Sequence, residues 1–280
     1  MISVNFSQKI ANIMLWASAL ITIAILFIMV GHILLNGVEV IDLQFLLESP
    51  KNAGREGGIL PMIVSSLYTT GLALIVAIPL GIGSAIYLTE YAVKSPLTKA
   101  IRYATETLSG IPSIVVGLFG YTFFVIYLGL GFCVLSAGLT LSIMALPIIM
   151  RTAEESVRTV PIGYREGSLA LGASKWQTIR KVLLPSASPG IVTGIVLGMG
   201  RAIGETAAIM FVVGGGWRMP ISPLSPAQPL TVHLYELFSA GIISTEIGYG
   251  TATVLLAMVL AITFTANWTM RRYIKKIMGE

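Results

Sequence analysis

Arg201 and Glu205 are the residues best placed to do chemistry, because they are charges inside an otherwise apolar, charge-free stretch from Ser186 to Val213. A charge in the middle of a membrane costs roughly 2.5–3.5 kcal/mol even on insertion scales, so such residues are usually paired or functional. Arginine offers a rigid fork of donors that suits an oxyanion. The spacing of four residues places both charges on one helix face. We expect Arg201 to contact a moving anion and Glu205 to tune and orient it; the alternative is a self-neutralising pair that only fixes helix packing.

The composition requires a membrane as the surrounding solvent. Of the 280 residues, 55% are hydrophobic and 11% are charged, whereas a typical soluble domain has about 25% charged residues. A soluble fold of this composition would expose large apolar patches and aggregate. The apolar runs are long and continuous, unlike the short alternating segments of a membrane barrel. We therefore predict an all-α fold, a polytopic membrane helix bundle with about six transmembrane helices of roughly 20 apolar residues each.

Stretches without charge give the positions of these spans. The predicted spans are about Ile13–Leu35, Met62–Leu88, Leu108–Leu128, Phe132–Met150, Ser186–Val213 and the stretch between Glu246 and Arg271. Gly129 and Gly131 predict a tight turn between the third and fourth spans. We divide the chain into 1–60, an N-terminal transmembrane helix with an outer loop, and 61–275, a transmembrane core.

The basic residues divide unequally between the predicted loops. With the N-terminus inside, 14 of the 18 Lys and Arg residues lie in inner segments, three lie in outer loops, and Arg201 lies in a span. Lys and Arg are retained on the cytoplasmic side of short loops, so we expect both termini to be cytoplasmic. Topology and contact with membrane lipid then explain most of these residues, and no nucleic acid partner is predicted.

The sequence lacks the residue patterns of a catalyst. It contains no glycine-rich phosphate loop of the form GxxxxGK[ST]. Cys133 is the single cysteine, and His32 and His233 are far apart in sequence, so neither a metal site nor a cofactor is predicted. We expect the chain not to be an enzyme, and any ATP hydrolysis to come from a partner.

The longest inner loop, residues 151–184, contains a spaced pattern that ends at Leu184 and Pro185. Glu166 begins the pattern, Gly172 lies six residues later and Val182 ten residues after that. This spacing resembles the cytoplasmic signature of ABC importer permeases, which is Glu-Ala-Ala, three residues, Gly, nine residues, Ile, one residue and Leu-Pro. Small and β-branched residues replace the two alanines and the isoleucine. The resemblance implies a type I permease architecture and a coupling helix near 165–176 that sits in a groove of the ATPase subunit. The residues assigned to this contact are Glu166, Gly167, Ser168, Gly172, Ala173 and Trp176.

Three longer stretches, 57–91, 108–121 and 164–206, resemble the permeases of the phosphate-specific importer. The FLLESP and PLTVHLYELFSAG segments are more similar to the A-type subunit than to the C-type. The resemblance implies half of a pathway for inorganic phosphate in a bacterial or archaeal cytoplasmic membrane. It also implies a second related permease in a heterodimer, two ATP-binding subunits and an external phosphate-binding protein. In the resembled family, the RAxGET stretch carries an arginine implicated in the pathway, which matches Arg201.

Other functions stay open on the residues alone. The same architecture could import molybdate, sulfate or an organic solute, or the chain could be the C-type phosphate permease. A stand-alone channel or secondary transporter is a different class, but secondary transporters usually show paired repeats, and none is evident here. An intramembrane protease would need paired catalytic polar residues, and only Arg201 and Glu205 are charged inside the spans.

Three glycines of the fifth span, Gly190, Gly194 and Gly198, recur every four residues and form one small-residue ridge. Such ridges allow helices to approach closely in membranes. We expect this helix to lie at the centre of the permease pair, near the pathway. An ordinary helix contact within the subunit is an equal alternative.

Overall fold

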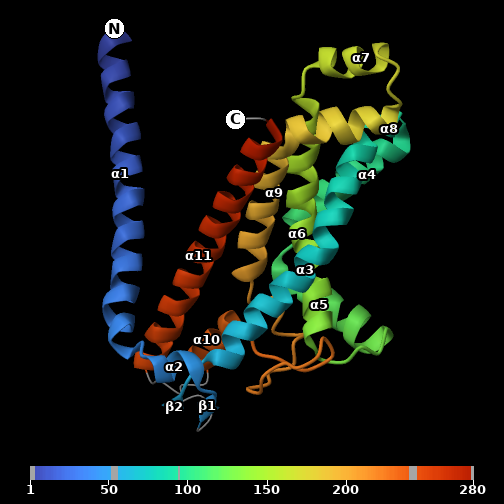
Figure 1. Cartoon of the computed structure of the whole chain (residues 1–280). Coiled ribbons are helices and arrows are strands. Elements are labelled where there is room, and N and C mark those ends of the chain that lie inside the picture. The colour runs from blue at the N-terminus through green and yellow to red at the C-terminus, as the bar shows by residue number, and fades with distance from the viewer. Residues whose placement is uncertain (1–3, 52–55, 94, 240–244, 279–280) are drawn as a thin grey trace.

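The computed structural model describes residues 4–51, 56–93, 95–239 and 245–278, and this part of the chain is almost entirely helical (Figure 1). Five helices are long and apolar enough to cross a membrane, and a strongly bent pair makes a sixth if it counts as one span. The predicted all-α membrane bundle is therefore confirmed. A two-stranded antiparallel sheet, β1 (Pro50–Lys51) and β2 (Glu56–Gly57), is a small exception.

Most helices follow one another with short connections, and the long irregular stretch 204–229 between α9 and α10 is the exception among the described residues. In chain order they are α1 (Val4–Gly37), α2 (Leu43–Leu47), α3 (Leu60–Ile86), α4 (Pro96–Gly110), α5 (Ser113–Gly120), α6 (Val134–Arg158), α7 (Ile162–Ala170), α8 (Lys175–Thr178), α9 (Leu184–Ile203), α10 (Leu230–Ser239) and α11 (Thr245–Met278). A 3₁₀ turn, η1 (Val38–Val40), follows α1. Three π-helical turns continue other helices: η3 (Tyr87–Tyr91) after α3, η4 (Tyr121–Tyr127) after α5, and η5 (Ile179–Leu183) between α8 and α9.

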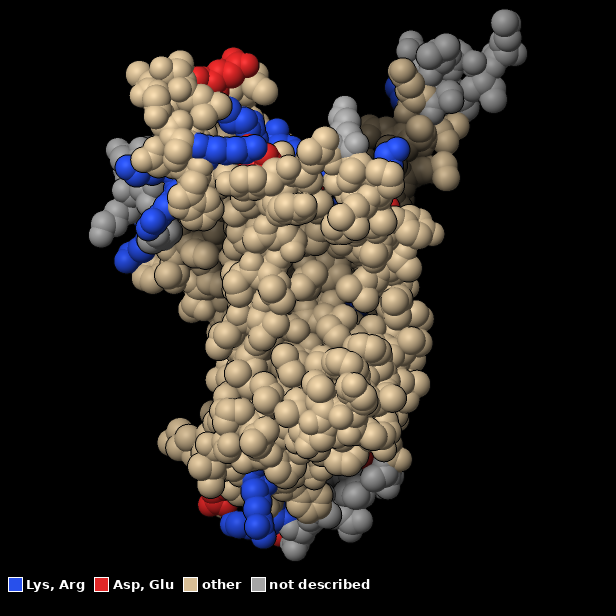
Figure 2. Space-filling model, turned by 90° about the vertical axis from the view of Figure 1, so that its right-hand side faces the viewer, with Lys and Arg blue, Asp and Glu red and all other residues tan. Residues whose placement is uncertain are grey.

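The molecule has two ends separated by an apolar band. The described parts of α1 and α11 bring both chain termini to the end that carries α7, which we call the α7 end, whereas α2, both strands and α10 lie at the opposite, α10 end (Figure 1). Charged side chains gather at these two ends on the face shown in Figure 2, and the broad middle of that face is mostly free of them. This distribution fits a bilayer around the middle of the molecule.

The core of the bundle is formed by α3, α6 and α9, and the glycine ridge lies inside it. A Cβ atom on Gly194 would stand 2.8 Å from Cβ of Thr152, and one on Gly198 would stand 2.7 Å from Cγ1 of Ile149, both on α6. Gly190 faces Ser156 of the same helix in the same way. The ridge thus permits close packing of α9 on α6. The ridge therefore makes the alternative contact, an ordinary one within the subunit, and the position of α9 at the centre of a permease pair stays a prediction.

The first helix joins the bundle near the α10 end. His32 Nε2 lies 3.2 Å from the Tyr249 hydroxyl, and Thr253 Oγ1 donates to the Ile33 carbonyl at 3.2 Å. Both partners are on α11, and toward the α7 end α1 stands apart from the bundle (Figure 1). Gly37 reaches the same part of α11, where a Cβ would collide with Thr253 and the Tyr249 backbone.

Two predicted spans have the wrong limits. The third is not one straight helix over Leu108–Leu128, because α4 and α5 are bent by 105° at a short break. Pro112 causes the break: it lacks an N–H group and disfavours a helical conformation in the residue before it, and Ile111 is accordingly extended, with φ −70° and ψ 132°. The turn predicted at Gly129 and Gly131 is confirmed, since both have positive φ.

The fifth span is shorter than Ser186–Val213, because α9 ends at Ile203 and irregular turns follow. The Glu205 carboxylate accepts a hydrogen bond from the Ala208 N–H at 3.4 Å. Side-chain bonds of this local kind compete with continued helix, and Gly204 at the helix end has little helix propensity of its own.

Candidate functional site

Arg201 lies in the last turn of α9 and lines a small cavity of about 70 Å³ at the α4–α5 break. Its side chain is exposed, and the described residues offer it no hydrogen bond or ion pair. Ser109 is the other polar side chain of the cavity. The remaining lining residues are apolar and come from α4, α5, α6 and the break between α4 and α5: Leu108, Ile111, Val116, Ile143, Met144 and Ile148. An unpartnered guanidinium among apolar groups can accept an anion without first losing an ion pair.

Glu205 does not pair with Arg201. It follows the end of α9, its carboxylate bonds the Ala208 N–H, and its carbonyl accepts from Thr231 Oγ1 at 2.9 Å. The expectation that both charges share one helix face is wrong, because the helix ends between them. Glu205 instead holds the turn that follows Arg201 and ties it to α10.

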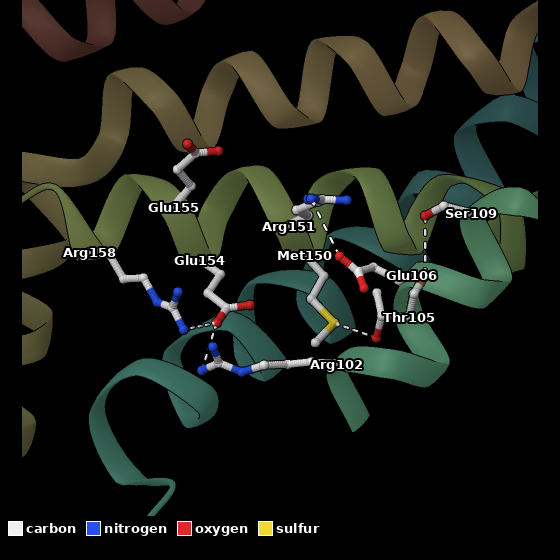
Figure 3. Close-up of a pocket in the computed structure, with 9 residues that line it drawn as sticks. All are labelled: Arg102, Thr105, Glu106, Ser109, Met150, Arg151, Glu154, Glu155 and Arg158. Atoms are coloured by element: carbon white, nitrogen blue, oxygen red, sulfur yellow. Dashed lines mark hydrogen bonds and ion pairs between the residues drawn. The ribbon is translucent and has the colours of Figure 1, made fainter. Parts of the chain in front are cut away.

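A second cavity of about 300 Å³ lies toward the α7 end, between α4 and α6 (Figure 3). Oε1 of Glu154 forms ion pairs with Nη2 of Arg102 at 2.9 Å and with Nη2 of Arg158 at 2.7 Å. The Glu154 side chain is 12% exposed. A looser pair, Arg151 with Glu106 at 3.5 Å, lies on the exposed side. Ser109 lines both cavities, so the two are neighbours along α4 and α6. The sequence alone predicts only a topological role for these basic residues, and no spacing pattern marks the cluster because its members come from two distant segments.

The loop between α6 and α9 forms two short helices, α7 and α8, rather than one coupling helix near 165–176. The Gly172 N–H donates to the Leu169 carbonyl at 2.9 Å, and the Ala173 N–H donates to the Ser168 carbonyl at 3.2 Å, which closes the end of α7. Gly172 has φ +81°, and a Cβ there would meet nothing within 4 Å. Glycine is therefore required for the left-handed backbone, and not for close approach within this chain.

The outer surface of α7 and α8 is apolar for a loop. None of the α7 residues is buried, and Leu171 is 90% and Trp176 57% exposed. The hydroxyls of Ser168 and Thr178 lie 2.9 Å apart and hold α7 against the end of α8. Exposed apolar side chains grouped at one end of a molecule mark an interaction surface.

Residues 77–279 match the family of binding-protein-dependent transport system inner membrane components. The chain belongs to this family. A relative named a probable ABC transporter permease, YqgI of Bacillus subtilis, is 35% identical over 98% of both chains. The phosphate transport system permease PstA 2 of Mycobacterium bovis is 31% identical, over 96% of this chain and 92% of its own.

Solved permeases share the fold. A chain of a bacterial alginate ABC transporter, solved in complex with a periplasmic protein carrying an alginate pentasaccharide, has a TM-score of 0.66 at 17% identity, over 96% of this chain and 98% of its own. A chain of the MetNI methionine transporter has a TM-score of 0.58 at 20% identity, over 79% and 94%. The predicted type I permease architecture is confirmed.

Family membership settles the class of protein. The chain is a permease subunit of an ABC importer and a multi-pass inner membrane protein, and such subunits work with ATP-binding subunits and an external binding protein. The family is one of membrane components and not of catalysts. A stand-alone channel, a secondary transporter and an intramembrane protease are therefore set aside.

Proposed function

We propose that this permease forms half of a pathway for inorganic phosphate, driven by ATP hydrolysis in partner subunits. The observation that carries this proposal is Arg201, a guanidinium without a partner among the described residues, in the last turn of α9 and of the candidate span Lys175–Ile203. Relatives named as PstA phosphate permeases, including one from Xylella fastidiosa at 33% identity over 85% of this chain, support phosphate as the anion. The observations favour no second substrate, because the alginate and methionine transporters are similar in fold alone.

Arg201 suits this task for physical reasons. Its guanidinium stays charged at any working pH and presents a planar fork to phosphate oxygens. Glu205 supports it by fixing the turn after α9 through the Ala208 N–H and Thr231. A carboxylate close in sequence but not bonded to Arg201 would also keep the anion from being held too tightly to leave.

The α7–α8 loop is proposed to dock on an ATPase subunit. The residues in this role are Glu166, Gly167, Ser168, Gly172, Ala173 and Trp176. The exposed apolar side chains of the loop support this contact. The described ends of α1 and α11 lie at the α7 end (Figure 1), which supports the proposal that both termini are cytoplasmic.

A complete importer would contain a second related permease, two ATP-binding subunits and an external phosphate-binding protein. The purified complex in vesicles, supplied with binding protein, should take up labelled phosphate only when ATP is present on the α7 side. Excess unlabelled phosphate should compete, and sulfate or molybdate should not. Uptake that sulfate or molybdate blocks as well as phosphate does would contradict the proposed substrate.

A further inference from the structure

A cluster of hydrogen bonds around Arg165 joins α7 to the membrane helices. Arg165 Nε and Nη2 donate to Glu90 Oε1 at 3.1 and 3.0 Å. Its Nη1 donates to the Val160 carbonyl and its Nη2 to the Val157 carbonyl, both at 2.8 Å. These carbonyls lie at or just beyond the end of α6, where backbone acceptors have no partner within the helix. We call Arg165, Glu90 and the two carbonyls the clamp.

The clamp attaches α7 to η3 and to the end of α6 by side-chain hydrogen bonds. None of the α7 residues is buried. Its other side-chain bond, from Ser168 to Thr178, stays within the same loop. Among the described residues, Arg165 therefore makes all the hydrogen bonds that run from α7 side chains to α6 and to η3. Arg165 is 19% and Glu90 11% exposed, so the pair is shielded from water, unlike an exposed ion pair of small worth.

The π-helical turn η3 receives further contacts beside the clamp. Lys175 Nζ of α8 stands 4.7 Å above the ring of Tyr91, which is the residue after Glu90. The Leu88 carbonyl, also in η3, accepts a hydrogen bond from Arg102 Nη2 of α4 at 3.3 Å. Thus η3 is bonded on one side to the α7–α8 loop and on the other side to α4.

The route continues from α4 to the Arg201 cavity. From Arg102, helix α4 continues to its end beside the break at Ile111. The last turn of α4 supplies Leu108 and Ser109 to the lining of the Arg201 cavity. Movement of η3 would therefore displace the wall opposite Arg201. No element along this route needs to bend except at the existing α4–α5 break.

We propose that Arg165 is a positioning residue that transmits movement of the α7–α8 loop to η3, and through Leu88 and Arg102 to α4 and the Arg201 cavity. The inference rests on the proposed docking of this loop on an ATPase subunit. Arginine is required because its fork reaches one carboxylate and two carbonyls in different directions. A lysine carries all its donors on one nitrogen and cannot span them.

The test uses the full complex with its binding protein and compares Arg165→Gln, Arg165→Lys and Glu90→Gln with Arg180→Gln. Arg180 is exposed on η5 and makes no side-chain hydrogen bond among the described residues, so it is a matched control. In the three clamp variants we expect the ATPase subunits to stay bound and basal hydrolysis to persist. Stimulation of hydrolysis by loaded binding protein should fall about tenfold, within the 5–150-fold range of coupling between sites. The control should be stimulated normally.

Covalent repair separates transmission from simple stability. Glu90→Cys with Arg165→Cys, joined by a bifunctional thiol reagent long enough to span the former ion pair, should regain stimulation, and the unlinked chain should not. Each chain with only one of the two introduced cysteines controls for reaction of the reagent at the native Cys133, which is buried. A linked chain that assembles without regaining stimulation would overturn the proposal.

Two further outcomes count against the clamp. Normal stimulation of ATP hydrolysis in Arg165→Gln or Arg165→Lys would show that movement of the α7–α8 loop is not transmitted through this residue. Loss of the ATPase subunits from both variants would give Arg165 a docking role instead. Docking itself is tested by Trp176→Ala, which should release the ATPase subunits without disturbing the clamp. The stimulation readout works with whatever solute the binding protein carries, so a wrong substrate assignment would not be mistaken for a failed clamp.

Discussion

Arg165 and Arg201 carry the same guanidinium in opposite surroundings. Arg165 gives its hydrogens to a carboxylate and two backbone carbonyls and is 19% exposed. Arg201 has no such partner among the described residues and lines a mostly apolar cavity. A satisfied guanidinium fixes the geometry of the elements around it. An unsatisfied one in a candidate membrane span is costly to keep, and this cost supports the proposed contact of Arg201 with a moving anion.

The two regions also differ in how they are built. The Arg165 clamp joins α7 to the Glu90 side chain of η3, to the Val157 carbonyl of α6 and to the Val160 carbonyl just after α6. The Arg201 cavity depends on two helix interruptions, the end of α9 and the α4–α5 break. Broken helices are tolerated at membrane depth where they line a cavity, which is the situation of Arg201.

The largest effect is expected from removing the free guanidinium. Arg201→Gln should lower phosphate uptake at least 100-fold, which corresponds to about 2.7 kcal/mol, in a complex that still assembles and hydrolyses ATP. The double variant Arg201→Gln with Glu205→Gln should not restore uptake, because Glu205 bonds Ala208 and not Arg201. Recovery of uptake in the double variant would make the two residues a structural pair and remove the contrast with Arg165.

The next effect concerns the ridge that sets the position of α9, and with it Arg201. Gly198→Ala places a Cβ 2.7 Å from Cγ1 of the buried Ile149, and overpacking of this kind costs ~1–3 kcal/mol. The melting temperature of the solubilised complex should fall. Gly200→Ala is the matched control, because a Cβ there meets nothing within 4 Å. Equal melting temperatures for the two variants would mean that α9 can move away from α6 freely.

A smaller effect is expected at the end of α7, beyond the clamp. Gly172→Ala forces an alanine into a left-handed conformation, at a cost of about 1–2 kcal/mol. Binding of ATPase subunits to the variant should weaken by roughly tenfold, since 1.4 kcal/mol corresponds to that factor. Gly163→Ala, at an open position of α7 without positive φ and outside the proposed contact residues, should bind normally. A Gly172→Ala complex as tight as the Gly163→Ala complex would show that this turn is not part of the contact.

The smallest effect is expected at a third arginine of intermediate surroundings. Arg151 reaches Glu106 at 3.5 Å, and both side chains are more than 60% exposed. Exposed pairs contribute about 0–1 kcal/mol, so Arg151→Gln should leave stability and uptake nearly unchanged in thermal and transport assays. A loss of uptake as large as that of Arg201→Gln would indicate a second essential arginine, in the larger cavity between α4 and α6.

Much of the fold could be predicted from the sequence because lipid imposes a simple rule. Every membrane helix needs a long apolar run, so the first, second, fourth and sixth spans were found close to their observed positions. The breaks were harder to predict. Charged residues at the start of α4 concealed its helix, and apolar residues after Ile203 concealed the end of α9.

The sequence by itself determined the membrane class and the position of the α7–α8 loop, because composition and spacing are local properties of the chain. The tertiary structure alone decided which charges have partners. Arg165 meets Glu90 across 75 residues, and Arg102 meets Glu154 from another helix. No local pattern encodes such pairs, since they depend on how three helices pack. The same packing filled the glycine ridge with α6 and left Arg201 facing an open cavity.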